Sequence, residues 1–181
     1  MKIILIRHGM TEGNLKRRYI GTTDEDLINT DCLKGDYPKC ERVVASPLKR
    51  CIQTAEYIYP NVDIEICDKL KECDFGDFEN KSYEELKDNP DYQKWLDNNG
   101  ELPFPNGETH EDFKNRCKDG FFESLTERDT AFVIHGGSIM AIMQKLFGGN
   151  FYDYQVKNGC GYEFEMRNGE IVDDYSPIGC G

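Results

Sequence analysis

Residues 1–14 read MKIILIRHGMTEGN and combine an apolar run with a charged turn. Residues 2–6 are short, apolar and rich in β-branched side chains, which predicts a buried strand. The run stops at the glycine-containing turn Arg7-His8-Gly9. In open α/β sheets, ligands bind beyond the carboxyl ends of the strands. The turn after this strand is therefore a candidate functional position.

Downstream of this segment, predicted strands alternate with predicted helices. Strands are predicted at residues 42–45, 62–66 and 131–134, and helices at 91–97, 108–124 and 138–147, while residues 82–85 form a capping box that opens another helix. A further helix is predicted to open with Ser46 as N-cap and Pro47 at its first position, and to run to about Ile58. The alternation in residues 162–167, followed by Asn168-Gly169, predicts a terminal hairpin. The fold class is therefore α/β: a three-layer α/β/α sandwich with a mostly parallel, doubly wound sheet and a C-terminal antiparallel hairpin.

The length of 181 residues predicts one domain, spanning 1–181, with a helical cap-like insert at about 75–107. The insert is rich in aromatic side chains, which could either grip a ligand or form a small core of their own. Residues 29–41 contain Gly35 and Pro38, so a short helix or an irregular loop is expected there. A sheet face left less covered by this segment would leave room for a second copy, as in a homodimer.

The composition excludes several classes of function. With 22 Lys+Arg and 34 Asp+Glu, the formal net charge of -12 opposes binding to nucleic acid and to anionic membranes. Without a long apolar run or a signal peptide, a cytoplasmic location is expected. The eight cysteines are scattered and form no Cys-x-x-Cys, which argues against a zinc site and favours small apolar residues kept reduced.

Two of the three histidines directly follow predicted core strands. His8 and His135 are each followed by glycine, which lets a ligand approach the backbone. With Arg7 and Arg50 they would form a cationic cup that suits a phosphate monoester, because arginine donors match phosphate oxygens. The third histidine, His110, is interpreted as a surface residue.

Phosphoryl transfer also needs a nucleophile and a proton donor. Neutral imidazole is a competent nucleophile, and neighbouring cations favour the neutral form. A carboxyl group near the cup would protonate the leaving oxygen. Glu72 is the first candidate, and three nearby carboxyl groups stay open as alternatives: Asp74, Asp77 and Glu79.

The blocks around these residues resemble, in order, those of the histidine phosphatase superfamily, the phosphoglycerate-mutase-like proteins. The first block, LIRHGMTEGN at 5–14, resembles the signature Arg-His-Gly-x-Thr-x-x-Asn. The later blocks are SPLKRCIQTA at 46–55, LKECDFG at 70–76, PNGET at 105–109 and VIHGG at 133–137.

This resemblance implies a role for each matching residue. His8 would accept the phosphoryl group, and Arg7, Arg50 and His135 would hold its equatorial oxygens. Glu72 would protonate the leaving oxygen and then activate water. Asn14, Thr11 and the backbone around Gly21 would complete the cradle. The resemblance implies no metal and no cofactor.

The resemblance therefore predicts a metal-independent phosphatase that acts on a small phosphorylated metabolite. The blocks at 75–79, 106–108 and 158–160 look most like those of α-ribazole-phosphate phosphatases of cobalamin biosynthesis, whose aromatic base would suit the insert. A broad-specificity phosphatase is the first alternative. A phosphoglycerate mutase and a non-catalytic module that binds phosphorylated ligands are further alternatives.

Overall fold

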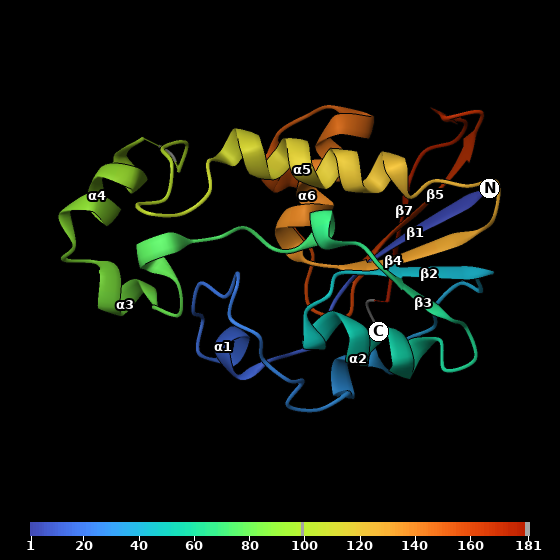
Figure 1. Ribbon diagram of the computed structural model, residues 1–181, viewed down its shortest axis with the longest axis horizontal. Helices are drawn as coiled ribbons and strands as arrows, with labels where there is room; N and C mark the ends of the chain where they lie inside the picture. The colour runs from blue at the N-terminus through green and yellow to red at the C-terminus, as the bar shows by residue number, and fades with distance from the viewer. Residues whose placement is uncertain (99, 180–181) are drawn as a thin grey trace.

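The computed structural model describes residues 1–98 and 100–179, which form an α/β fold around one seven-stranded sheet (Figure 1). The sheet order is β3-β2-β4-β1-β5-β6, and β7 also pairs with β5. The strands are β1 (Lys2–Arg7), β2 (Arg42–Ala45), β3 (Ile64–Ile66), β4 (Thr130–Ile134), β5 (Gly161–Arg167), β6 (Glu170–Ile171) and β7 (Ser176–Ile178).

The strands β3, β2, β4 and β1 run parallel, and β5 adds to β1 in the antiparallel direction. The predicted hairpin is confirmed: Asn168 and Gly169 both have positive φ, 54° and 81°, and β5 pairs with β6 across them. Two positive φ values suit the twist of a tight hairpin. The predicted mixed α/β class is likewise confirmed.

Helices cover both faces of the sheet, as Figure 1 shows: α5 and α6 lie on one side and α2 on the other. Figure 1 places α3 and α4 at one end of the molecule, away from the sheet. The α-helices are α1 (Glu12–Leu15), α2 (Lys49–Ile58), α3 (Tyr83–Leu86), α4 (Pro90–Asp97), α5 (His110–Glu123) and α6 (Gly136–Phe147). Short 3-10 turns are η1 (Asp31–Leu33), η2 (Asp68–Leu70), η3 (Gly76–Phe78) and η4 (Phe151–Tyr154).

Alternate side chains of β1 pack into two separate hydrophobic cores, one on each face of the sheet. Ile3 and Leu5 pack with residues of α5 and α6, whereas Ile4 and Ile6 pack with residues of α2. Because both faces of this strand are buried, its sequence is a continuous apolar run. The three layers follow directly from that burial.

Residues 29–41 contain only the 3-10 turn η1, as the glycine and the proline of this segment predicted. Among the residues that the structure describes, six cysteines are free thiols: Cys32, Cys40, Cys51, Cys67, Cys73 and Cys117. Cys160 is disulfide-bonded, so the prediction of reduced cysteines does not hold for it. Within residues 1–98 and 100–179, no helix has both the length and the apolarity that a membrane span needs.

Two adjacent rings on α5 test how this helix packs. Phe121 is fully buried against the sheet, whereas Phe122 is 39% exposed. Phe121→Ala leaves a cavity, and we expect it to lower the free energy of unfolding by about 3–5 kcal/mol. Phe122→Ala should cost less than about 1 kcal/mol. Urea denaturation of both variants measures the difference, and equal losses would contradict this packing.

Candidate active site

The parallel pairing of β1 and β4 brings the two predicted histidines together. Arg7 and Ile134 are register partners at the ends of these strands, so the next residues, His8 and His135, emerge at the same edge of the sheet. Their ring centroids lie 5.2 Å apart, at an interplanar angle of 65°. Both side chains are buried.

His8 is held as a neutral imidazole with one defined tautomer. Its Nδ1 lies 2.7 Å from the carbonyl oxygen of Gly9, so Nδ1–H donates and Nε2 keeps its lone pair. Burial, helped by the charges of Arg50 and Arg7, lowers the pKa of His8 well below its ordinary value. A neutral imidazole with a free Nε2 is the form that can attack phosphorus.

Arg50 is fully buried and connects His135 to the loop at residues 21–23. Its Nε donates to His135 Nδ1 at 3.3 Å, while Nη1 donates to Thr23 O at 2.7 Å and Nη2 to Gly21 O at 2.8 Å. Because Nδ1 of His135 accepts, its Nε2–H donates to Ser46 Oγ at 2.8 Å. Burial and the charge of Arg50 lower the pKa of His135 as well.

The predicted start of the helix after β2 was wrong. The helix α2 begins at Lys49 with Leu48 at the cap position, and Leu48 makes no side-chain cap bond. The hydroxyl of Ser46 accepts from the backbone N–H of Leu48 at 3.5 Å and bonds His135 more closely, so it belongs to the site. The rule that selected His8 could have found it, because Ser46 also directly follows a buried parallel strand.

Arg7 has an unused donor beside the N-terminus of α6. Its Nη1 donates to Val156 O at 2.7 Å, but its buried Nε has no hydrogen-bond partner among the described residues. A Cβ added at Gly136 would lie 3.4 Å from this Nε. An orphaned guanidinium donor next to a helix N-terminus is a suitable place for an anion.

Asn158 holds the turn after β1, a role that the sequence analysis missed. Its Nδ2 donates to the carbonyl oxygens of His8 and Gly9, both at 3.1 Å, and to Asn14 Oδ1 at 2.9 Å. Asn158, which lies shortly before β5, therefore fixes the backbone of His8 and Gly9. Only the resemblance at 158–160 pointed to this segment, and it assigned the residue no role.

The three predicted substrate-binding residues differ in what they contact. Asn14 lines the cavity of the site. The hydroxyl of Thr11 caps α1 and accepts from the backbone N–H of Asn14, and Thr11 is fully buried. Gly21 uses its N–H for Glu79 and its carbonyl for Arg50. Direct contacts of Thr11 and Gly21 with a substrate stay predictions.

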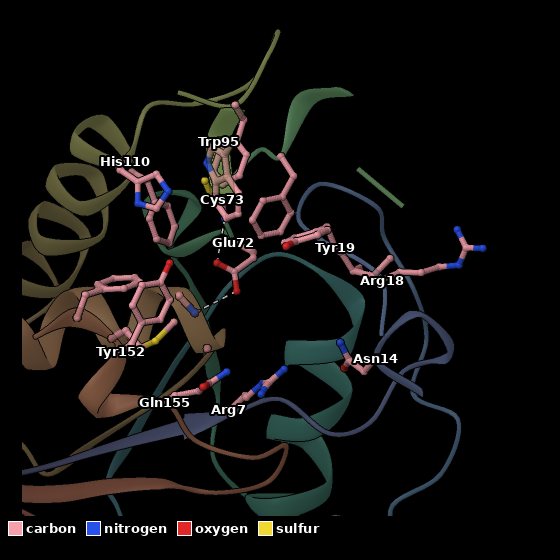
Figure 2. A pocket seen from close by; sticks show the side chains of 18 residues that line it. Arg7, Asn14, Arg18, Tyr19, Glu72, Cys73, Trp95, His110, Tyr152 and Gln155 are labelled. Atoms are coloured by element: carbon pink, nitrogen blue, oxygen red, sulfur yellow. Dashed lines mark hydrogen bonds between the residues drawn. The ribbon is translucent and has the colours of Figure 1, made fainter. Parts of the chain in front are cut away.

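Glu72 is the candidate donor that faces the cavity (Figure 2). Its Oε1 accepts from Cys73 N at 3.0 Å and its Oε2 from Gly137 N at 3.2 Å. Burial raises the pKa of Glu72, although these hydrogen bonds and the two arginines oppose the shift. A raised pKa keeps the carboxyl group protonated to higher pH, as a proton donor requires.

The three alternative donors are engaged elsewhere. Glu79 accepts from the backbone of Gly21 and Thr23, Asp77 accepts from Asn106, and Asp74 accepts from Gly76 N. None of the three lines the cavity that Glu72 faces. The geometry therefore favours Glu72 as the donor.

The cavity has a volume of about 310 Å³ and two chemically distinct ends. Figure 2 shows Glu72 between them, with Arg7, Asn14 and Gln155 on one side and Tyr19, Trp95 and His110 on the other. The aromatic side chains that line it are Tyr19, Phe75, Trp95, Phe104, His110, Phe113, Phe151 and Tyr152. His8, Arg50 and His135 are buried next to this cavity rather than part of its wall.

The sequence left open whether the rings of the insert form a small core or face a ligand site, and the structure places some rings in the core alone and others along the cavity as well. Phe78 and Tyr92 are buried in a cluster with Leu86 and do not line the cavity. Trp95 and Phe104 belong to the same cluster and also line the cavity. The insert therefore has its own small core, and one face of that core is a wall of the site.

The interpretation of His110 as a surface residue was wrong. The ring is half-buried and stacks on Phe104, with centroids 5.3 Å apart and an interplanar angle of 24°. It lines the cavity, and burial lowers its pKa. Thr109 caps α5 and so places His110 at the first helical position, next to the aromatic insert. The acidic residues around His110 in the sequence suggested an exposed position, which is why its burial was missed.

Comparison with known proteins identifies the family. A family model for the histidine phosphatase superfamily (branch 1) matches residues 3–173. The chain belongs to the histidine phosphatase superfamily. The match spans all the sequence blocks that supply the residues of this site.

Three relatives of this histidine phosphatase cover most of both chains. An uncharacterized phosphatase, PhoE, from Bacillus subtilis is 32% identical over 94% of this chain and 92% of its own. The broad-specificity phosphatase YOR283W from Saccharomyces cerevisiae is 30% identical over 81% of this chain and 70% of its own. The crystal structure of the alpha-ribazole phosphatase from Shigella flexneri has a TM-score of 0.79 and 25% identity, and covers 94% of this chain and 93% of that chain.

The raised pKa of Glu72 predicts how the rate depends on pH. Because the carboxyl group loses its proton as pH rises through that pKa, kcat/KM for an alkyl phosphate should fall on the basic side. Glu72→Gln should lower this constant by about 100-fold or more and remove the basic limb. Because p-nitrophenol needs little protonation to leave, p-nitrophenyl phosphate should be affected less. An unchanged pH profile in the variant would show that another group donates the proton.

Proposed function

We propose that this histidine phosphatase is a metal-independent phosphomonoester hydrolase that acts through a phosphohistidine at His8. The observation that carries the proposal is the pairing of two groups in one site. The site holds a neutral imidazole with a free Nε2, at His8, and a carboxyl group whose pKa burial raises, at Glu72. These are the nucleophile and the acid that ester cleavage needs.

The reaction would proceed in two steps. First, the Nε2 lone pair of His8 forms a bond to phosphorus, the P–O ester bond breaks, and the leaving oxygen takes the proton of Glu72. In the second step, water attacks phosphorus while the Glu72 carboxylate takes its proton. The N–P bond then breaks, its electron pair returns to His8, and inorganic phosphate is released.

Positive charge for the phosphoryl oxygens would come from the protein itself. Arg7 offers its unpartnered Nε, and Arg50 keeps one N–H on each terminal nitrogen after its loop contacts. The N-terminus of α6 adds backbone N–H groups and a favourable dipole. For His135 to contact an oxygen as well, its Nε2–H would exchange Ser46 Oγ for that oxygen. Charge stabilisation of this kind is the main work in phosphoryl transfer.

The aromatic side chains at one end of the cavity favour a substrate whose leaving group carries an uncharged, planar ring. Two lining residues are cationic: Arg7 lies at the phosphate end, and Arg18 pairs with Glu85 and donates to Asn80 O. Figure 2 shows the guanidinium of Arg18 directed away from the cavity. No lysine or arginine of the described lining is therefore free to pair with a carboxylate in the leaving group.

A substrate of this class is α-ribazole 5′-phosphate, whose benzimidazole base could stack on the rings. The relative named as an alpha-ribazole phosphatase supports testing it first. The relative named as a broad-specificity phosphatase supports the alternative, in which the same walls accept many apolar esters. The cytoplasmic location and the homodimer stay predictions from the sequence.

Phosphate release measured in EDTA tests the proposed function. We expect turnover of α-ribazole 5′-phosphate and of aryl phosphates, and slower turnover of 3-phosphoglycerate and phosphoserine. His8→Ala should abolish release, and mass spectrometry of the wild type, quenched in an alkaline denaturant that preserves the N–P bond, should find the phosphoryl group on His8. Isomerised phosphoglycerate would instead indicate a mutase. Tight phosphate binding without turnover would indicate a binding module, and activity retained by His8→Ala would exclude the covalent route.

Trp95 tests the aromatic wall. Trp95→Leu keeps an apolar side chain but removes a stacking surface, so KM for an aryl phosphate should rise by about tenfold. The KM for glycerol phosphate, which has no ring, should change little. Tyr83→Leu is the matched control, because Tyr83 is an insert ring that is 53% exposed and does not line the cavity. A similar rise in KM for both substrates would contradict a stacking role.

A further inference from the structure

Glu108, in the PNGET block, has no role in the proposed reaction, yet it forms an ion pair behind the segment that carries Glu72. Arg116 of α5 donates from Nε to Glu108 Oε1 at 2.9 Å and from Nη2 to Oε2 at 2.7 Å. The two side chains are 26% and 17% exposed. A forked, largely buried pair of this kind is fixed in geometry, unlike a single contact at the surface.

The remaining donors of Arg116 bind backbone carbonyl oxygens of residues 69–72. Nη1 donates to Lys69 O at 2.8 Å and to Lys71 O at 3.0 Å, and Nη2 donates to Glu72 O at 3.4 Å. A guanidinium has five N–H groups, and these contacts together with Glu108 use all of them. The side chain therefore holds the backbone that leads to the proposed acid.

Glu108 fixes the other side of the same segment. Its Oε2 accepts from Asp74 N at 3.3 Å, and its own N–H donates to Asp74 O at 2.9 Å. The backbone on both sides of Glu72 is thus tied to Arg116 in the middle of α5 and to Glu108 just before that helix. The carboxyl group of Glu72 itself contacts Cys73 N and Gly137 N, and neither member of the ion pair touches it.

The tolerance for misplacement of Glu72 is small. A Cβ added at Gly137 would overlap Glu72 Oε1 and would lie 2.9 Å from Phe113 Cζ, so this carboxyl group fills a confined space. A general acid must reach the leaving oxygen within hydrogen-bond distance. An error of about 1 Å in such a group can cost about 100-fold in rate.

We infer that Arg116 and Glu108 are positioning residues that hold Glu72 in place to protonate the leaving oxygen. This inference rests on the proposed function. The ion pair supplies neither a proton nor a contact with the phosphoryl group. Its loss should therefore impair the transfer of the proton more than the attack of His8.

The test compares two esters that differ in their need for a proton. Arg116→Gln removes the charge and most of the donors, and Glu108→Gln breaks the charged fork at nearly constant volume. We expect each to lower kcat/KM for an alkyl phosphate by about 10- to 100-fold, and that for p-nitrophenyl phosphate by much less. The ratio of the two constants is the readout.

Lys69→Gln is the matched control. The ammonium group of Lys69 pairs with Glu123 at 2.6 Å between the same two elements, η2 and α5, but on the surface. This substitution removes an ion pair and leaves the carbonyl that Arg116 binds. The ratio of the two constants should stay at the wild-type value.

The Glu72→Gln background separates this inference from the proposed function. With the acid removed, adding Arg116→Gln should not change the ratio further. A wild-type ratio in Arg116→Gln, with both esters equally affected, would overturn the positioning role. If Glu72→Gln itself left the ratio unchanged, the proposed function would fail at its donor. Should Arg116→Gln not fold, Arg116→Lys, which keeps the charge without the fork, applies the same test.

Discussion

The positive charge of Arg7, which lines the cavity, and of Arg50, which is fully buried, is the constraint on which the rest of the site depends. Burial, reinforced by these two guanidinium charges, lowers the pKa of His8 and of His135 well below the ordinary value, so both imidazoles are neutral. Neutrality gives His8 its lone pair. The protein satisfies Arg50 with the loop carbonyls of Gly21 and Thr23 and leaves Arg7 Nε unpartnered. A phosphate dianion would supply the missing counter-charge and acceptors in one group.

The fold supplies this site from elements far apart in sequence that meet at one edge of the sheet. The strands β1, β2 and β4 deliver His8, Ser46 and His135 respectively, because parallel strands end on the same side. Two loops of the site also pack closely against each other through their backbones. At Gly21, any Cβ would overlap the carbonyl oxygen of Cys73, so the loop that holds Arg50 packs directly on the loop that follows Glu72.

The sequence predicted every strand except β7, most of the helices, and that His8 and His135 emerge at one edge of the sheet, because burial and glycine-marked turns are local signals. It missed side chains whose role depends on distant partners. Ser46 reads as a helix cap until His135 is placed 2.8 Å from its hydroxyl. His110 reads as exposed among acidic residues until the insert folds Phe104 against it. Asn158 carries no local signal at all, because its three acceptors come from residues 8, 9 and 14.

The position of the two arginines inside the site, rather than on the outer surface, has a consequence for how a substrate arrives. The chain as a whole has a formal net charge of -12, so its long-range field repels a phosphate ester, while the attractive charges act only at short range. The net negative charge of the protein therefore opposes the approach of a phosphate ester from a distance. Dissolved salt screens that repulsion beyond about 8–10 Å and leaves the buried contacts largely intact. Ionic strength should therefore assist encounter here, opposite to its effect on enzymes that steer their substrates electrostatically.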